Sequence, residues 1–130
     1  MEWIERLNTT IEYIENHLTE KIDYEQLAKI AGCPSYQLSK TFLYMTNISL
    51  SEYIRKRRIS LAAVDLQTGE DKIIDIALKY GYESPTAFNR AFQAVHGIAP
   101  SLVRKKNVQI KSFPALKFTF SIQGLDELSL

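Results

Sequence analysis

The sequence predicts an all-α protein of two helix-turn-helix subdomains joined by a linker helix, about seven helices in all, with a short C-terminal β-strand or hairpin tail. Three observations support this prediction: an internal duplication, a glycine that ends the first helix of each copy, and a central helix that is apolar on two sides. A length of 130 residues suffices for one ordinary domain with a hydrophobic core. We expect the helical domain to span 1–107, as subdomains 1–48 and 68–107 around the linker helix 49–67, and the tail to span 108–130.

The duplication is visible in the segments Leu27–Gly32 and Ile76–Gly81, which align at a separation of 49 residues. After the glycine the separation becomes 50, because one residue has been inserted in a turn. Each copy consists of an apolar-periodic helix, a glycine, a short turn and a second helix, which is the helix-turn-helix pattern. A left-handed backbone conformation at Gly32 and Gly81 would explain why glycine occupies both turns. The matched positions beyond the turn are Leu38 and Phe88, Lys40 and Arg90, Phe42 and Phe92, Asn47 and Gly97, and Ile48 and Ile98.

Apolar residues that recur at steps of three and four predict the individual helices. Asp23 and Asp71 are expected to cap the second and fifth helices, and Ser84 followed by Pro85 is a typical start for the sixth. The expected ranges are Trp3–Leu18, Tyr24–Ala31, Ser35–Met45, Leu50–Leu66, Lys72–Tyr80, Pro85–His96 and Ser101–Lys106.

The fourth of these helices is apolar on two sides, and such a helix should be covered on both. We therefore expect it to join the two copies and to pack against each, holding their second helices about one DNA turn apart. One side carries Leu50, Tyr53, Ile54, Leu61 and Val64, and the other carries Ile59, Ala63 and Leu66.

The net charge is only +1, but the positive charge comes in two groups. The first group contains Lys40 and Arg55–Arg58, and the second contains Arg90 and Arg104–Lys106. Each group lies in or just after the second helix of one copy. This distribution favours two contacts with a polyanion.

Subtracting the buried stripe from each second helix leaves a face with side chains that can read DNA bases. Arg90 can bind guanine, Asn89 and Gln93 can bind adenine, and Lys40 can contact guanine or phosphate. Apolar contacts with sugars or thymine methyl groups are expected for Tyr36 and Leu43. The two exposed faces are Tyr36, Ser39, Lys40 and Leu43, and Thr86, Asn89, Arg90 and Gln93.

The basic residues behind these faces are candidates for contacts with DNA phosphates. Arg57 shares an apolar face of the linker helix, so for this residue an internal ion pair is an equal alternative. The predicted phosphate contacts are Ser35, Arg55, Lys56, Arg58, Ser84, Arg104, Lys105 and Lys106.

Over Ile4–Lys106 the chain resembles the AraC/XylS family of bacterial transcription regulators. In the first copy the resemblance rests on Leu27–Ala28, Gly32, Leu38–Ser39–Lys40, Phe42 and Tyr53–Ile54. In the second copy it rests on Ile76–Ala77, Gly81–Tyr82, Ser84, Phe88, Arg90, Phe92, Gly97, Pro100 and Arg104.

The resemblance implies a sequence-specific regulator of transcription that binds double-stranded DNA. We expect an activator of transcription. Its two recognition helices would enter successive major grooves on one face of the DNA. Two positions depart from the family pattern: Asn47 replaces a glycine, and Lys40 replaces an arginine, which removes bidentate base reading. The implied base contacts are Tyr36, Ser39, Lys40, Thr86, Ala87 and Arg90.

The tail alternates apolar and polar residues over Ala115–Gln123, which predicts a half-buried strand. It is similar to the opening strand of a GyrI-like effector-binding domain. We therefore expect the chain to be a fragment or truncated relative of a longer regulator, whose small-molecule effector would act only through the missing domain. The tail itself should be mobile, or be ordered by pairing with itself, with the helical body or with a second copy.

Other classes of function find little support in the sequence. The single cysteine, Cys33, has no catalytic partner nearby, so we expect no enzyme, no cofactor and no metal. His17 and His96 lie near helix ends, where their charge would favour the helix dipole. Without an apolar run of about 20 residues or a signal peptide, no membrane partner and a cytoplasmic location are expected. The expected partner is double-stranded DNA, bound by a monomer; the alternative is a protein-interaction module that docks RNA polymerase.

Overall fold

The computed structural model describes residues 2–106, 108–110 and 112–119, apart from the side chain of Lys106. Within these ranges it contains seven helices and no strand, so the predicted all-α architecture is confirmed. The helices are α1 (Glu2–Asn16), α2 (Tyr24–Ala31), α3 (Ser35–Thr46), α4 (Leu50–Thr68), α5 (Ile73–Lys79), α6 (Pro85–His96) and α7 (Pro100–Lys106).

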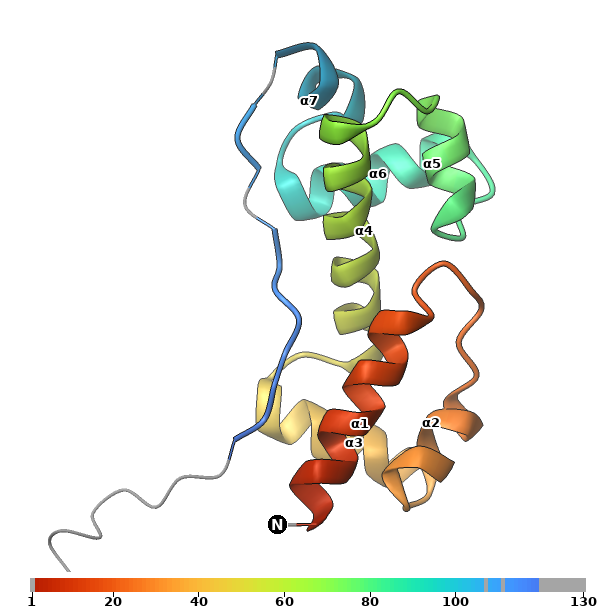
Figure 1. Ribbon diagram of the computed structural model, residues 1–130, viewed down its shortest axis with the longest axis vertical. Helices are drawn as coiled ribbons and strands as arrows, with labels where there is room; N and C mark the ends of the chain where they lie inside the picture. Colours follow the sequence, from red (N-terminus) through yellow and green to blue (C-terminus); the bar gives the residue numbers. More distant parts are fainter. Residues whose placement is uncertain (1, 107, 111, 120–130) are drawn as a thin grey trace, which may run out of the picture.

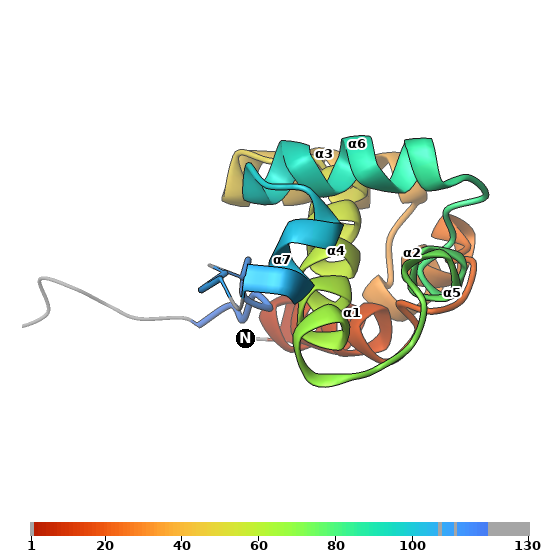
Figure 2. The ribbon, with the colours of Figure 1, turned by 90° about the horizontal axis from the view of Figure 1, so that it is seen from above.

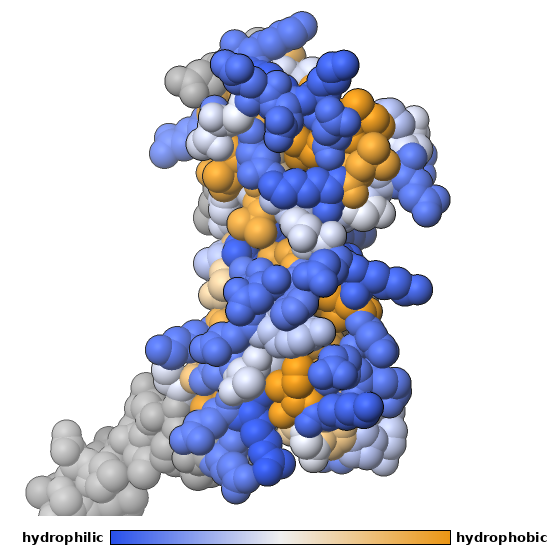
Figure 3. Space-filling model, turned by 45° about the vertical axis from the view of Figure 1, so that its right-hand side comes forward, coloured by the Kyte–Doolittle hydropathy of each residue, from blue (hydrophilic) through white to orange (hydrophobic). Residues whose placement is uncertain are grey.

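The long helix α4 forms the axis of the molecule, with three helices gathered around each end (Figure 1). At its N-terminal end α4 packs against α3, and α1 and α2 complete the first subdomain. At its C-terminal end α4 packs against α5, α6 and α7, which form the second subdomain. Figure 3 shows the result as two lobes separated by a narrower waist.

Each subdomain has its own hydrophobic core, and α4 contributes to both. Leu50, Tyr53 and Ile54 belong to the first core, whereas Ile59, Ala63 and Leu66 belong to the second. Leu61 packs against both cores from the middle of the helix. The prediction that α4 is covered on two sides is therefore confirmed, except at Val64, which is 43% exposed.

The turns have the backbone conformations that their residues predict. Gly32 and Gly81 have φ angles of 75° and 89°, in the left-handed region that glycine adopts without strain. Asn47 replaces glycine at a φ of 62°, consistent with the tolerance of asparagine for this region. The side chain of Asp23 accepts a hydrogen bond from the Glu25 backbone N–H and caps α2 as expected.

Three local expectations were wrong. Asp71 does not cap α5, because that helix begins one residue later and its N-cap position is Lys72, which forms no side-chain cap. Helix α1 ends at Asn16 and not at Leu18, although Leu18 is still buried in the first core. Met45 follows Leu38 and Phe42 at helical spacing, which predicts an inward-facing side chain, yet it is 36% exposed at the end of α3.

The tail does not form the predicted strand within its described part. Residues 108–110 and 112–119 run as extended chain along the helical body, and Phe113, Leu116 and Phe118 pack against the first core. Of the three arrangements considered for an ordered tail, packing on the helical body is the one observed for these residues. The remainder of the expected strand, residues 120–123, lies outside the described residues.

His96 differs from the expectation of a charged histidine at a helix end. Its ring lies 4.6 Å from that of Phe92, its Nε2 is 3.3 Å from the Ile59 carbonyl oxygen, and its Nδ1 is buried without a hydrogen-bond partner in the described structure. Burial lowers the pKa of His96 below the ordinary value of 6.5. Desolvation therefore outweighs the helix dipole, and the neutral imidazole is the stable form.

This environment predicts a loss of stability in mild acid. The unfolded chain takes up the His96 proton as the pH falls through about 6.5, whereas the folded chain resists it, so the free energy of unfolding decreases below that pH. We expect the melting temperature to fall between about pH 7.5 and 5.5, and the fall to be smaller in His96→Gln. Thermal unfolding followed by circular dichroism measures both, with His17→Gln as the control for loss of an imidazole. An identical fall in wild type and His96→Gln would contradict the assignment.

Candidate nucleic-acid interface

The second helices of the two copies, α3 and α6, lie on one face of the molecule, at opposite ends of α4 (Figures 1 and 2). Both have 12 residues, and both follow a turn that contains a left-handed glycine. On the sides facing the cores they bury phenylalanines: Phe42 in α3, and Phe88 and Phe92 in α6. The opposite sides are therefore fixed toward solvent, as the periodicity predicts.

The exposed side of α6 brings together four of the predicted base-reading residues. Thr86, Asn89, Arg90 and Gln93 line a shallow, open depression of about 370 Å³. The Gln93 Nε2 donates a hydrogen bond of 2.7 Å to the Asn89 Oδ1, which orients the Asn89 amide. Arg90 is exposed and forms no ion pair with any residue of the described part of the chain. Ala87 is exposed one residue after Thr86.

The exposed side of α3 is more apolar than that of α6. Tyr36 is 69% exposed and Leu43 is 48% exposed, whereas Ser39 is half-buried and Lys40 is the only cation in the helix. Tyr44, with 90% of its surface exposed, was not among the predicted readers. Its position makes it a further candidate, because residues 36, 40 and 44 follow one another at steps of four along one stripe of the helix.

The two serines predicted to contact phosphate lie at the beginnings of these helices. The Ser84 Oγ accepts a hydrogen bond of 3.1 Å from the Ala87 backbone N–H, so Ser84 is the N-cap of α6. At α3 the N-cap position is Pro34, and the Ser35 hydroxyl donates to the Glu25 carboxylate at 2.8 Å. Both hydroxyl groups thus have partners inside the protein.

Most of the basic run in α4 is engaged within the protein. The Arg57 guanidinium pairs with the Glu15 carboxylate at 2.6 Å, and its side chain is only 11% exposed. Of the two alternatives for Arg57, the internal ion pair is therefore the one observed. The Lys56 ammonium lies over the Phe113 ring, 5.2 Å from its centroid. Arg55 is exposed, although it contacts Glu52 one helical turn earlier.

Two arginines predicted to contact phosphate instead hold the ends of helices. Arg58, in α4, donates to the carbonyl oxygens of Leu18 and Glu20 beyond the end of α1, at 2.9 and 2.7 Å. Burial lowers the pKa of Arg58. Sequence analysis missed this role, because the carbonyl groups lie 38 to 40 residues away in the chain.

Arg104 repeats the same arrangement in the second subdomain. From α7 it donates to the carbonyl oxygens of Leu66, Gly69 and Asp71, at and beyond the end of α4. In both subdomains an arginine that follows the helix-turn-helix thus binds backbone carbonyl groups at or just beyond the end of the helix that precedes it. Lys105 is exposed, and the side chain of Lys106 lies outside the described residues.

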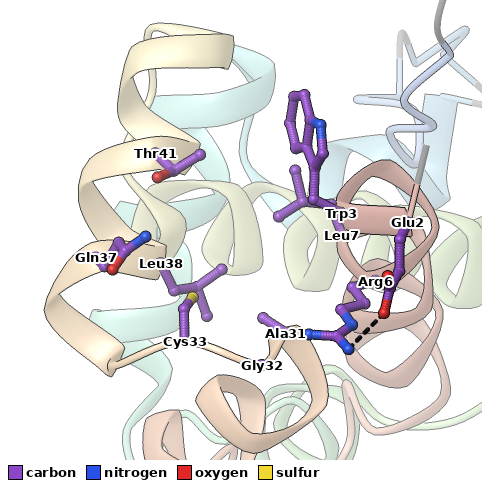
Figure 4. Close-up of a pocket in the computed structure, with 10 residues that line it drawn as sticks. All are labelled: Glu2, Trp3, Arg6, Leu7, Ala31, Gly32, Cys33, Gln37, Leu38 and Thr41. Carbon is purple, nitrogen blue, oxygen red and sulfur yellow. Dashed lines mark hydrogen bonds and ion pairs between the residues drawn. The ribbon is translucent and has the colours of Figure 1, made fainter.

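The first helix-turn-helix is also braced by α1. Figure 4 shows an open pocket of about 540 Å³ where Trp3 and Leu7 of α1 face the turn and α3. The Arg6 guanidinium approaches Gly32 so closely that a Cβ atom there would lie 2.3 Å from the Arg6 Nη1. Gly32 is therefore favoured by its left-handed backbone, and any larger residue there would also displace the end of the flexible Arg6 side chain.

Neither a membrane-crossing helix nor a cluster of metal ligands is found in residues 2–106, 108–110 and 112–119. No helix there is long and apolar enough to cross a bilayer. No group of three or more His, Cys, Asp or Glu side chains there could hold a metal ion.

Comparison with known proteins agrees with the helix-turn-helix architecture. A family model described as a helix-turn-helix domain matches residues 27–106. The HTH-type transcriptional activator AarP of Providencia stuartii is 41% identical over 92 residues, which make up 71% of this chain and 68% of AarP. Regulatory protein SoxS of Salmonella typhimurium is 38% identical over 100 residues, which make up 77% of this chain and 94% of SoxS.

A solved structure supports the fold. The DNA-binding domain of AdpA, a global transcriptional factor crystallised with a target DNA, superposes with a TM-score of 0.68 at 23% identity, covering 75% of this chain and 88% of that chain. The family model matches more than half of this chain, and AarP and SoxS are each covered over more than two thirds of their lengths. The chain therefore belongs to the AraC/XylS family of DNA-binding transcription regulators.

Proposed function

We propose that one copy of this chain reads two successive major grooves, with α3 in one groove and α6 in the next. The observation that supports this is the placement of both helices on one face, each with an exposed stripe of side chains suited to base edges. The proposed base-reading residues are Tyr36, Ser39, Lys40, Thr86, Ala87, Asn89, Arg90 and Gln93.

The two half-sites should differ in sequence because the two helices differ in chemistry. On α6 the Arg90 guanidinium can bind the O6 and N7 atoms of guanine, and the Asn89 amide, oriented by Gln93, can bind adenine. On α3 the exposed Tyr36 and Leu43 suit the methyl groups of thymine. The single ammonium of Lys40 discriminates bases less sharply than the planar guanidinium of Arg90.

For the phosphate contacts we propose the exposed cations Arg55 and Lys105, together with the helix starts at Ser35 and Ser84. Arg58 and Arg104 are left out, because their guanidinium groups are occupied by backbone carbonyl groups.

We further propose that the regulator activates transcription, with RNA polymerase as its protein partner. Support comes from AarP, whose name describes it as a transcriptional activator. With α3 and α6 on DNA, the surfaces of α1, α2 and α5, which lie away from that face in Figure 2, would remain available for a protein contact.

Replacing Arg90 with alanine should abolish specific recognition without unfolding the chain. Loss of one guanine contact costs about 1–3 kcal/mol, or roughly tenfold to a hundredfold in affinity. The measurement is a binding titration on a site selected from random DNA by the wild-type protein, with helical content checked by circular dichroism. Lys29→Ala removes the same charge from the exposed side of α2 and is the matched control. Unchanged affinity and base preference in Arg90→Ala would refute the assignment.

A single chain should occupy one non-palindromic site. Half-sites about 10 bp apart are separated by ~34 Å, whereas the 19 residues of α4 span about 28 Å, so the DNA should bend toward the protein. Sedimentation of the complex gives the stoichiometry, and mobility of permuted fragments gives the bend. Two chains on a strictly palindromic site would contradict this prediction.

Neighbouring residues Arg104 and Lys105 should show opposite effects. Arg104→Met should lower the melting temperature and leave the salt dependence of DNA binding unchanged, because its guanidinium holds the end of α4. Lys105→Met should leave stability unchanged and reduce the slope of log affinity against log salt by about 1, as expected for one phosphate contact. If Arg104→Met reduced the salt dependence and Lys105→Met lowered the melting temperature, Arg104 and not Lys105 would be the phosphate contact.

A further inference from the structure

The tail connects the two subdomains on one side of α4. We call its described residues, 108–110 and 112–119, the strap. Ile110 packs against the second core, and Phe113, Leu116 and Phe118 pack against the first. Figures 1 and 2 both place the strap beside α4, on the side opposite α2 and α5. The strap thus crosses the waist between the two lobes.

Side chains of the helical body bind the backbone of the strap at four residues: Val108, Phe113, Leu116 and Phe118. At Val108 the Gln67 Nε2 donates a hydrogen bond to the carbonyl oxygen. The Ser60 Oγ accepts a hydrogen bond from the Phe113 N–H at 2.8 Å, and the Tyr53 hydroxyl accepts from the Leu116 N–H at 3.0 Å. The Asn8 amide both donates to the Phe118 carbonyl and accepts from its N–H, each at 2.7 Å.

Two of these partners in the body are buried beneath the strap, whereas Asn8 is half-buried. Tyr53 is 0% exposed and Ser60 is 1% exposed with the strap in place, so the strap supplies hydrogen bonds to polar groups that are shielded from water. Burial raises the pKa of Tyr53 to about 12, so the hydroxyl keeps the proton that it donates to Glu15. Arg57, held by its ion pair with Glu15, also donates to the Phe113 carbonyl. The body is therefore built to hold an extended segment at this place.

The opposite side of α4 is not crossed by the strap. There, between the two lobes, lies an open pocket of about 320 Å³, lined by Ile22 and Tyr24 from the first lobe and by Tyr80 and Tyr82 from the second. The relative position of the lobes thus depends on the shape of α4, and long helices are rarely straight but curve gently. A second connection on the strap side would resist such bending.

We propose that the strap is a positioning element for DNA reading: it holds α6 at a fixed place relative to α3 and so sets the half-site spacing that the chain accepts. This inference rests on the proposed two-groove binding. The strap would act mechanically, because bending of α4 would move α6 along the DNA relative to α3. Loosening the strap should broaden the range of spacings bound and lower the affinity at the best one.

The test compares binding to duplexes whose half-sites are spaced from about 9 to 12 bp. Ile110→Ala/Phe113→Ala removes one apolar contact from each side of the waist. Asn8→Ala is a milder variant that removes only the two hydrogen bonds to Phe118. Gln109→Ala/Thr119→Ala changes two exposed strap residues and is the matched control. All titrations use the full chain, at a temperature well below the melting temperature of each variant.

In wild type and the control, affinity should fall steeply when the spacing departs from its optimum by one base pair. The ratio of the affinity at the optimal spacing to the affinity one base pair away should decrease by about threefold or more in both strap variants. The decrease should be smaller in Asn8→Ala than in the double variant. A uniform loss of affinity at every spacing would overturn the proposal, because it would reveal a role in stability alone. Wild-type protein that binds no duplex at any spacing would instead refute the two-groove function on which the inference rests.

Discussion

The structure depends on one constraint, the burial of α4 on two sides. Tyr53 and Ile59 are both 0% exposed, yet they belong to different cores on different sides of the same helix. Neither group of outer helices can exclude water from its core without the half of α4 that completes it. The length of the helix that closes both cores therefore determines the approximate distance between the recognition helices.

Both subdomains also contain an arginine that binds at the end of a preceding helix. Arg58 and Arg104 act at the ends of different helices but do the same thing: each donates to backbone carbonyl groups where the chain leaves a helix. Arg58 thereby connects the loop before α2 to α4. Arg104 connects the loop before α5 to α7. The duplication thus extends beyond the matched residues to the way in which each module is closed.

The sequence was most informative where helical periodicity determines the outcome. Phe88 and Phe92 face the core and Asn89 and Arg90 face solvent, as their spacing predicts, because a regular helix distributes its side chains at fixed angles. The roles of Arg58 and of the tail were not predictable in this way. A basic residue in a sequence does not indicate which distant carbonyl will come within its reach. Alternation along the tail predicted which side chains would be buried, but not that helical side chains such as Ser60 would replace a partner strand.

The internal use of arginines also bears on how such a protein finds its site. With a net charge of +1 and with the guanidinium groups of Arg57, Arg58 and Arg104 engaged within the fold, the described part of the chain has fewer side chains that can contact the DNA backbone directly than its basic residues alone indicate. We therefore expect modest affinity for arbitrary DNA, which comes almost entirely from such contacts. Unrelated genomic sequence would then compete less for the protein, and occupancy of the proper site would depend more on the base contacts.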